Sequence, residues 1–513
     1  MTFQALSVYD LRRDYCAFLG DAYRGGWAWQ NPSSQSYGTA VIRVFAQAPD
    51  NAAAQISIVN AGERRTYLVP HAGEVPDEFD LRVKLATYVN VCEPIVDSYR
   101  DAVVRHVTRD LGALDNALKN LNGRGQTWSG LVNDVATWAL TYGYLPVVID
   151  APRTNPARNA AEEEALGIGL RAVVVHPQSI AWVDTDDDGC VNEFAWYERC
   201  DLGVNSSIYT TKVRVWNREE WYTVEGMADR TGLTRIREHA KSWPRLDQGR
   251  NPIGQVPVTW AFFNEDTTSR NPIGTSVIED IAPVARTIFN ELSRVEEDHR
   301  KGATFLAVPT TEASGGLSPD TEIRVGPDSA FGFASNTAPP SYVSPPSERA
   351  SEIRAHVLFL IALAYRMAGL EVAADSSAQV QSGEALRVRS RGFEDRCGGF
   401  AQSLERWERA ALTLVAAWLR AKPTIVLSYP KRFVLPDLGE DLARAVLLTE
   451  TWGSQLGQEG TIAVLRQAIN AALSLSEDQV NRLIDEIKSK LVQEAAPQTP
   501  LAMPVSTSVP GGA

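Results

Sequence analysis

Apolar positions repeat at helical spacing over much of the second half of the chain. One such pattern predicts a helix over about 276–301, whose distal end is crowded with charged residues. A second helix is expected over 347–368 and ends at Gly369, a residue type that commonly stops helices. A third begins at Ser382 and runs to about Ala421. Two ordinary helices followed by one very long helix form the most informative pattern in the sequence.

The segments between these helices are polar and rich in small residues. Residues 302–346 contain paired glycines and many prolines, which favour a loop or a small extended module whose strands pair with neighbouring chains. Residues 369–381 contain no Lys or Arg, which suits a loop facing a highly charged polymer, although a plain surface loop has the same composition. Gly398 and Gly399 predict a kink in the long helix.

The first half of the chain mixes helical and strand patterns, which predicts an α+β fold. A helix is expected over about 79–109, with a kink or break at Pro94, and another over 129–141. Residues 1–75 contain short mixed elements, with strand character at 40–45, and fit no clear assignment. Alternating or short apolar runs predict strands over 145–150, 170–175, 180–184, 192–198, 212–225, 232–239 and 256–263.

A short acidic turn, Asp184-Thr-Asp-Asp-Asp-Gly189, lies between two strand-like segments. It begins like a calcium-binding loop, with acidic residues at positions one, three and five and glycine at six. Position twelve is Ala195, where such a loop needs a bidentate Glu, and no helical pattern flanks the turn. A hairpin turn is therefore favoured over a metal site.

Composition excludes several broad classes of protein. The 513 residues are 44% hydrophobic and 22% charged, which is typical of a globular chain with more than one domain. The net charge of −13 argues against a surface that grips nucleic acid broadly, because phosphates need clustered Lys and Arg. The five cysteines show no C-x-x-C spacing and no secretory signal opens the chain, so a reducing cytoplasm is expected. The longest apolar run, Val357 to Leu363, is far shorter than the ~18–20 residues of a membrane span.

Motifs for catalysis and cofactor binding are missing from the sequence. There is no P-loop and no G-x-S-x-G nucleophile elbow. The six histidines are scattered singly, without a partner at zinc-ligand spacing. No carboxylate pair stands out among the many Asp and Glu residues. We therefore expect no catalytic residue, no metal and no cofactor, with an enzyme site built from dispersed carboxylates as the alternative.

Six short motifs carry a family resemblance. They are 90–99 (NVCEPIVDSY), the helix and strand over 136–150 with a Tyr-Gly turn, 176–182 (HPQSIAW) before the Asp/Gly hairpin, 274–281 (GTSVIEDI), 382–386 (SGEAL) and 433–438 (FVLPDL). Together they resemble the portal proteins of tailed bacteriophages over roughly residues 75–490. Each motif is weak alone, and their order along the chain, which is the family's order, is the more specific signal.

The resemblance implies a homo-oligomeric ring, expected to have twelve subunits, at one vertex of the capsid. Such a ring is assembled in the host cytoplasm, stays in the virion, and is the channel through which double-stranded DNA is packaged and later ejected. The implied partners are the terminase large subunit, a head–tail connector or adaptor protein, and the major capsid and scaffold proteins. DNA would pass non-specifically, because an acidic bore offers phosphates few anchors, and no membrane or enzymatic activity is implied.

The resemblance also divides the chain into the segments of a portal-type fold: an α/β wing, a two-helix stem, a small β-containing clip, a tunnel loop, a long kinked helix and a helical crown. Residues 1–75 stay unassigned or belong to the periphery of the wing. The other expected bounds are 76–275 for the wing, 276–301 and 347–368 for the stem helices, 302–346 for the clip, 369–381 for the tunnel loop, 382–432 for the long wing helix and a return strand, 433–494 for the crown and 495–513 for a disordered tail.

Three sets of candidate functional residues follow from this map. The tunnel loop is expected to approach DNA through Glu371, Asp375, Ser376, Ser377, Gln379 and Gln381. The stem helices contribute Ile281, Ile288, Leu292, Glu296, Glu297, Arg300, Ile353, Val357 and Leu360. The clip is expected to contact terminase and connector proteins through Glu322, Arg324, Phe331, Phe333 and Tyr342. The alternatives are another ring or adaptor protein of the virion and a carboxylate-based phage hydrolase.

Overall fold

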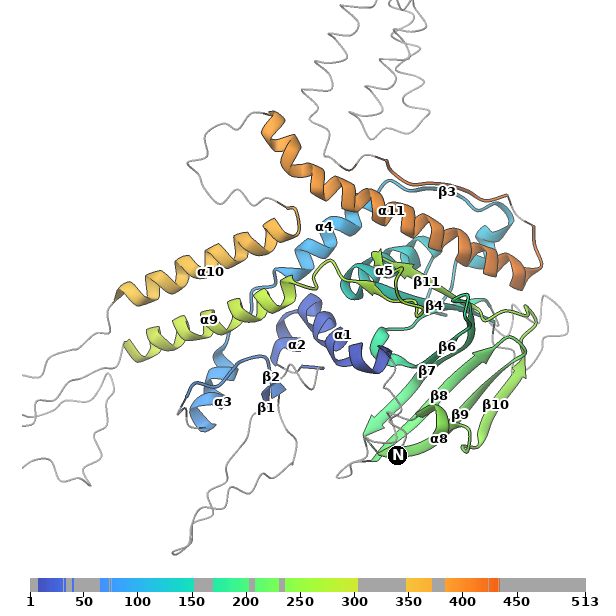
Figure 1. Ribbon diagram of the computed structural model, residues 1–513, viewed down its shortest axis with the longest axis horizontal. Coiled ribbons are helices and arrows are strands. Elements are labelled where there is room, and N and C mark those ends of the chain that lie inside the picture. The colour runs from blue at the N-terminus through green and yellow to red at the C-terminus, as the bar shows by residue number, and fades with distance from the viewer. Residues whose placement is uncertain are drawn as a thin grey trace, which may run out of the picture. The chain divides into compact units, whose positions relative to one another are not determined.

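A small antiparallel sheet whose middle strand is buried along its whole length lies at the centre of the fold (Figure 1). The middle strand is β4 (Tyr144–Asp150), flanked by β11 (Val258–Phe262) and β5 (Arg171–Val174). A short unbroken apolar run is what a strand covered on both faces requires. The run Leu145 to Ile149 therefore accounts for the central position of β4.

The protein is described here from a computed structural model. It describes residues 8–30, 32–33, 39–40, 65–72, 74, 76–151, 169–202, 208–229, 236–302, 347–370, 383–422, 424–431 and 433.

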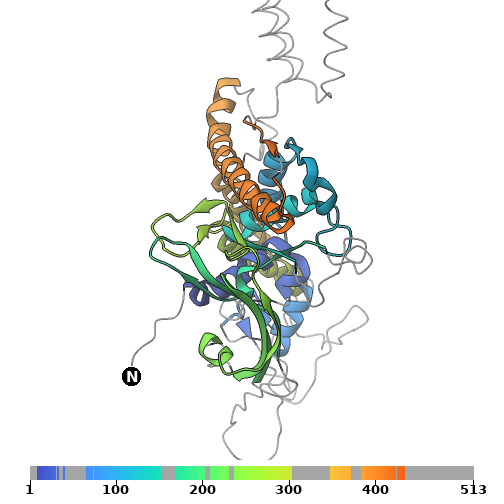
Figure 2. The same cartoon turned by 90° about the vertical axis from the view of Figure 1, so that its right-hand side faces the viewer.

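The two faces of the central sheet meet different partners. One face packs against α5 (Trp128–Tyr142) and α11 (Gly383–Leu419), and the Trp407 indole of α11 donates a hydrogen bond of 3.1 Å to Thr259. The other face meets α1 (Val8–Arg24) and a larger sheet, where Trp260 packs edge to face on Phe194. The two views place α11 and the larger sheet on opposite sides of β4 (Figure 1 and Figure 2).

The larger sheet is a five-stranded antiparallel meander in the order β10–β9–β8–β7–β6. One of its faces adds Phe194, Trp196 and Trp216 to the main core. The opposite face carries a separate small core, which the short helix α8 (Ile236–Ala240) covers. The strands are β6 (Ile180–Thr185), β7 (Val191–Leu202), β8 (Ile208–Asn217), β9 (Glu220–Asp229) and β10 (Arg245–Arg250).

The remaining elements are two long helices in the second half of the chain and a set of shorter helices and strands. They are α2 (Gly26–Gln30), β1 (Thr39–Ala40), β2 (Arg65–Thr66), α3 (Pro76–Leu85), α4 (Cys92–Val104), β3 (Thr108–Asp110), η1 (Gly112–Leu118), η2 (Pro177–Ser179), β12 (Asn264–Glu265), β13 (Gly274–Thr275), α9 (Ile281–Gly302), α10 (Ser347–Met367) and β14 (Val426–Ser428).

The expected α+β class is confirmed, and most of the long elements form where the sequence predicts them. Helices α5, α10 and α11 differ from the expected bounds by a residue or two, and α11 is continuous through Gly398 and Gly399, the pair expected to kink it. The first of the three C-terminal helices begins at Ile281 rather than near Ser276, because a turn precedes it.

The helical pattern expected over 79–109 breaks at 86–91 rather than at Pro94, and the chain forms two helices, α3 and α4. Pro94 does not break α4. It lies in the first helical turn, where its missing N–H has no intrahelical partner to lose.

The strand expected over 232–239 is also wrong where the structure describes it. Ile236 and Ala240 lie four residues apart, and both are buried against the five-stranded sheet as part of helix α8. Strand β10 was not predicted, because its sequence Arg245-Leu-Asp-Gln-Gly-Arg250 is polar and mostly exposed at a sheet edge. The acidic turn is a hairpin between β6 and β7, in which the Asp186 carboxylate accepts the Cys190 N–H at 2.7 Å.

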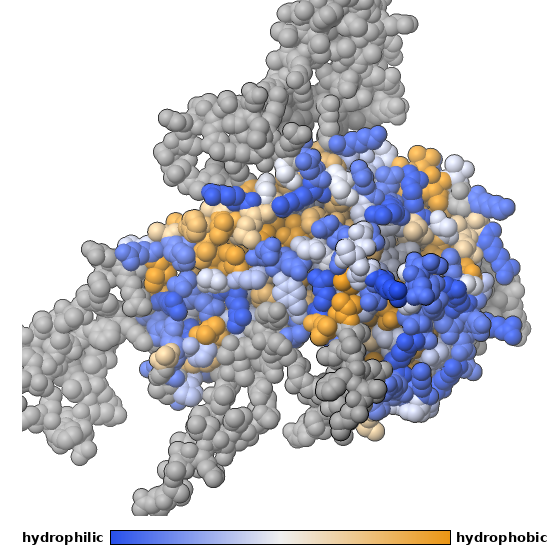
Figure 3. Space-filling model, viewed as in Figure 1, coloured by the Kyte–Doolittle hydropathy of each residue, from blue (hydrophilic) through white to orange (hydrophobic). Residues whose placement is uncertain are grey.

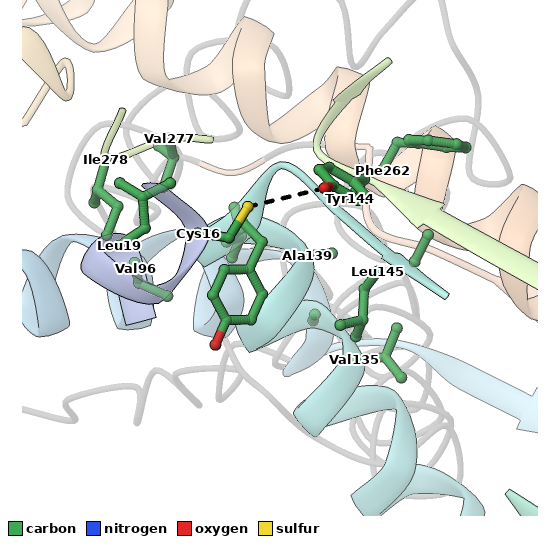
Figure 4. Close-up of a cluster of buried hydrophobic side chains, with 14 of the residues drawn as sticks. Cys16, Leu19, Val96, Val135, Ala139, Tyr144, Leu145, Phe262, Val277 and Ile278 are labelled. Atoms are coloured by element: carbon green, nitrogen blue, oxygen red, sulfur yellow. Dashed lines mark hydrogen bonds between the residues drawn. The ribbon is translucent and has the colours of Figure 1, made fainter. Parts of the chain in front are cut away.

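Helix α1, near the start of the chain, is part of the main core. Cys16 and Leu19 of α1 are buried beside Val96 of α4 and Ala139 of α5, and the Cys16 thiol lies 3.8 Å from the Tyr144 hydroxyl (Figure 4). The sequence pattern does not predict this helix, because polar residues interrupt its apolar positions.

A buried carboxylate joins four elements of the fold. Glu408 of α11 is fully buried and forms an ion pair of 2.6 Å with Arg109 of β3. It also accepts hydrogen bonds from the Trp128 indole of α5, at 2.7 Å, and from the Tyr429 hydroxyl after β14. Burial raises the pKa of Tyr429 and Glu408 raises it further, so the tyrosine remains a donor. The pairing of β3 with β14 is thereby tied to α11.

Replacing Glu408 by Ala is expected to destabilise the protein by about 3–5 kcal/mol, because the half-buried Arg109 charge and the donors of the buried Trp128 and Tyr429 would lose their partner. The matched control is Glu405→Ala one turn earlier, whose ion pair with Arg409 is largely exposed and should change stability by no more than about 0.5 kcal/mol. Urea unfolding of both variants measures the difference, and equal midpoints would contradict the role of Glu408.

Candidate functional site

Helices α9 and α10 lie side by side and run in opposite directions (Figure 1). The start of α9 lies next to α5, and the end of α10 lies next to α4, which itself packs on α5. Both helices therefore meet the α/β part of the structure in the same region. Residues 303–346 connect their other two ends. We call α9 and α10 the helix pair.

The turn that leads into α9 is fixed to the last turn of α5. The Ser276 hydroxyl donates to the carbonyl oxygens of Leu140 and Thr141, at 3.1 and 2.7 Å, and the Val277 N–H donates to Leu140 at 3.1 Å. These bonds satisfy carbonyl groups at the end of α5 that have no partner within the helix. The route of the chain into α9 is thus set by the end of α5.

The end of α10 is held by two other helices. The Tyr99 hydroxyl of α4 donates to the Ala368 carbonyl at 2.6 Å, and Arg396 of α11 donates to the Met367 carbonyl at 3.0 Å. Gly369, with φ of +71°, adopts the left-handed conformation that ends helices. The Arg396 side chain, next to the last turn of α10, also interacts favourably with the negative end of the α10 dipole.

Segment 65–85 contacts one side of α9 along its length. Asn290 donates to the Tyr67 carbonyl at 3.2 Å and accepts from the Val69 N–H at 2.8 Å. Arg82 of α3 forms a buried ion pair of 2.7 Å with Glu74 and contacts Ser293 at 3.3 Å. This contact was not predicted, because the partners are about two hundred residues apart in the chain. The one local sign of it is the run of polar residues at four- and three-residue spacing on α9.

The predicted stem residues that the structure describes are mostly core residues. Ile281, Ile288, Val357 and Leu360 are buried, whereas Leu292 and Ile353 are half-buried against the same core. Glu296 and Glu297 are half-buried, and the Glu297 carboxylate lies 3.2 Å from the His71 ring. Arg300 lies within α9, and its side chain is outside the described residues.

The residues of the other predicted sites are not among those that the structure describes. The tunnel-loop residues Glu371, Asp375, Ser376, Ser377, Gln379 and Gln381, the clip residues Glu322, Arg324, Phe331, Phe333 and Tyr342, and the crown all lie outside the described residues. Their roles stay predictions.

Helix α10 is apolar on two sides. The inner side, with Val357, Leu360 and Ala364, packs into the core. The outer side carries a second stripe at spacings of three and four residues, which we call the outer stripe: Ala355, Leu358, Phe359 and Ala362. Leu358 is 67% exposed and Phe359 is 56% exposed. Figure 3 shows apolar side chains gathered over this part of the helix pair.

A polar cavity of about 330 Å³ lies between the central and the five-stranded sheets. It is lined by residues that include Asp150, His176, Glu198 and Arg214. Arg214 lies 3.3 Å from Asp150 and 2.6 Å from Glu198, so one guanidinium joins both carboxylates. Burial raises the pKa of Asp150 to about 6, and the nearby Arg214 opposes that rise. Burial lowers the pKa of His176 to about 4, so its ring is neutral at pH 7.

Within the part of the chain that the structure describes, no group of three or more His, Cys, Asp or Glu side chains could hold a metal ion. None of the described helices is long and apolar enough to cross a membrane.

The solved structures to which the chain is similar include two from gene transfer agent particles. One belongs to the virion of a native gene transfer agent particle, with 15% identity, a TM-score of 0.37, and coverage of 80% of this chain and 94% of that chain. The other belongs to the neck of an empty gene transfer agent particle, with 13% identity, a TM-score of 0.39, and coverage of 76% and 94%. No family model and no curated protein sequence matches the chain. Similarity of this extent does not assign a function.

Gly143→Ala is expected to loosen the start of α9. Gly143 has φ of +85°, and a Cβ there would lie 2.4 Å from the backbone of Thr275, so both conformational strain and a steric clash oppose it. Gly123→Ala is the matched control, because it has φ of +75° and open space around it. We expect Gly143→Ala to cost about 1–3 kcal/mol more than the control in denaturant unfolding. Equal costs would show that the contact with Thr275 is unimportant.

Asp150→Asn is expected to reveal the raised pKa of Asp150 as a pH-dependent stability difference. A carboxyl group whose folded pKa lies above its unfolded value loses stabilising free energy as pH rises from about 4 to about 6. The Asn variant should therefore gain up to about 3 kcal/mol relative to the wild type across this window. His176 has the opposite pH dependence, since its pKa is lowered, and only the difference between the two proteins isolates Asp150. A pH-independent difference in melting temperature would contradict the assignment.

Proposed function

We propose that this chain is the subunit of a portal ring of a tailed phage or phage-like particle. The observation that carries the proposal is the arrangement of the three long helices. The antiparallel helix pair is fixed to the body at one end, flanks 303–346 at the other, and is followed by the 37-residue α11. A pair fixed in this way is a rigid arm suited to lining a channel, and α11 joins it to the α/β body.

The individual roles follow from this arrangement. The helix pair is the stem, segment 302–346 the clip that contacts the terminase large subunit and later a head–tail connector protein, and 369–381 the tunnel loop that approaches DNA. The α/β body is the wing, and 433–494 the crown. In this role the protein belongs to the virion, at one capsid vertex, where DNA enters during packaging and leaves during ejection.

The charge of the chain supports passage of DNA rather than its retention. A net charge of −13 per subunit gives a ring strong negative potential, and few clustered Lys or Arg are available to bind phosphates. Movement would be driven by a separate ATPase, and the subunit itself needs no active site.

The test of this function is the assembly state of the purified full-length protein. Light scattering should give a mass near twelve times 56.2 kDa, and negative-stain images should show rings with a central channel. The pure protein should not hydrolyse ATP. A monodisperse monomer at all concentrations, or ATP turnover that follows the protein through purification, would contradict the proposal.

Another ring or adaptor protein of the virion would pass the mass measurement, so a binding experiment separates the two. A portal ring should bind the purified terminase large subunit, whereas an adaptor ring should bind a portal ring instead. Sedimentation of the assembled ring with each partner gives the answer.

A hydrolase is the second candidate, because Asp150 has a raised pKa and lines a cavity. Arg214 forms ion pairs with both Asp150 and Glu198, the two carboxylates that would have to act as acid and base. That pairing favours a structural link between the two sheets over catalysis.

A further inference from the structure

We propose that the outer stripe of α10 docks against the α3 side of the helix pair in a second copy of this chain, so that copies join head to tail. This deepens the proposed ring and rests on it, and it names the two surfaces that meet. The receiving surface, which we call the α3 patch, consists of Val69, Leu81 and Leu85.

The outer stripe requires a partner on physical grounds. A helix that is apolar on all sides belongs in an interior, since water surrounds any side left open. Leu358 and Phe359 are more than half exposed although they lie in the most apolar run of the chain, Val357 to Leu363. Their position next to the small side chains of Ala355 and Ala362 leaves room for side chains of a facing surface.

The α3 patch lies on the opposite side of α9 from the apolar stripe that includes Ile288. The residues of α9 that contact segment 65–85 recur as Asn290, Ser293 and Glu297, which is the spacing of one helical face. Ile288 and Val295 lie on the other face and are buried. Figure 1 shows α3 and α10 on opposite sides of α9. The outer stripe and the α3 patch therefore belong to elements on opposite sides of α9.

The α3 patch has the exposure expected of an interface. Val69 is 50% exposed, Leu81 39% and Leu85 52%. Beside Leu85 is a cavity of about 220 Å³, which Arg82, Ser293 and Glu296 also line. It is smaller than the roughly 300–1,000 Å³ of a small-molecule pocket, so its size suits one inserted side chain.

The charges around the two surfaces are complementary. Exposed Arg354 and Arg366 flank the outer stripe, with Glu352 as the single exposed acidic residue of α10 among those described. Around the α3 patch, Asp77 and Glu78 are exposed and Glu296 lines the cavity, and Lys84 of α3 is exposed and pairs with Asp80, so acidic residues outnumber the basic one. Opposite net charges at the edges of two apolar surfaces favour their pairing and oppose the pairing of like surfaces.

The geometry selects a second copy of the chain as the occupant and a ring as the outcome. A two-fold dimer would place the same surface on both subunits, whereas these two surfaces differ and face apart. A repeated contact between unlike surfaces closes into a ring when its rotation allows.

Paired cysteine substitutions test which surfaces meet. The background carries Cys190→Ser and Cys200→Ser, and the buried Cys16, Cys92 and Cys397 are kept. Phe359→Cys combined with either Val69→Cys or Leu85→Cys should give, on mild oxidation of the assembled protein, a ladder of covalent oligomers beyond the dimer. Each single cysteine variant should stay monomeric on denaturing gels.

Each result decides the proposal. A dimer formed by Phe359→Cys alone would show a two-fold contact between outer stripes and overturn it. Rings that form normally but yield no ladder with either pair would overturn the docking while leaving the proposed function intact. A wild-type protein that never assembles would refute the proposed function and this contact with it.

A second measurement does not depend on the chemistry of cross-linking. Leu358→Asp with Phe359→Asp should raise the protein concentration needed for assembly by at least about tenfold, because two apolar contacts per interface are lost. Met227→Asp is the matched control, since Met227 is 72% exposed on the five-stranded sheet. Circular dichroism and thermal melting of the unassembled fraction show whether both variants fold. Folded double variants that assemble as readily as the control would overturn the proposal.

Discussion

The buried carboxylate of Glu408 is the constraint on which the arrangement of the long helices depends. A charge without water is costly unless ion pairs and hydrogen bonds replace its hydration, and Arg109, Trp128 and Tyr429 supply them from three other elements. Those elements must therefore meet at one point of α11. With α11 held there, Arg396 reaches the end of α10, so the position of the helix pair follows from the same network.

The helix pair combines rigid attachment with an incomplete surface. Its start is bonded to the end of α5, its end to α4 and α11, and one of its sides to segment 65–85. The outer side of α10 has no such cover among the described residues and is strongly apolar. Firm attachment at its ends and along one side is what a subunit needs if its shape is to be fixed before a neighbour arrives.

Polar chemistry in this chain is used mainly to join elements. Arg214 links the two sheets through Asp150, and Arg82 links α3 to the chain before it through Glu74. Buried ion pairs of this kind contribute less to stability than to a single well-defined arrangement, because burial of the charges offsets much of their attraction. That use of charge fits a protein whose proposed task is to hold a shape around moving DNA.

The sequence by itself determined the elements whose signals are local. The periodicity and stop residues of α5 and α10, the apolar run of β4 and the hairpin after β6 all depend on residues within one or two turns of each other, and the α+β class follows from them. The candidate stem residues Ile288, Val357 and Leu360 belong to apolar stripes that recur at helical spacing. Such a stripe shows which side of a helix is buried but not which element buries it. Only the tertiary structure decided that α1 belongs to the core, that 236–240 is helical, that Glu408 is paired and that segment 65–85 covers α9. Each of these depends on contacts between residues far apart in the chain, where burial against a distant partner outweighs the weak local preference.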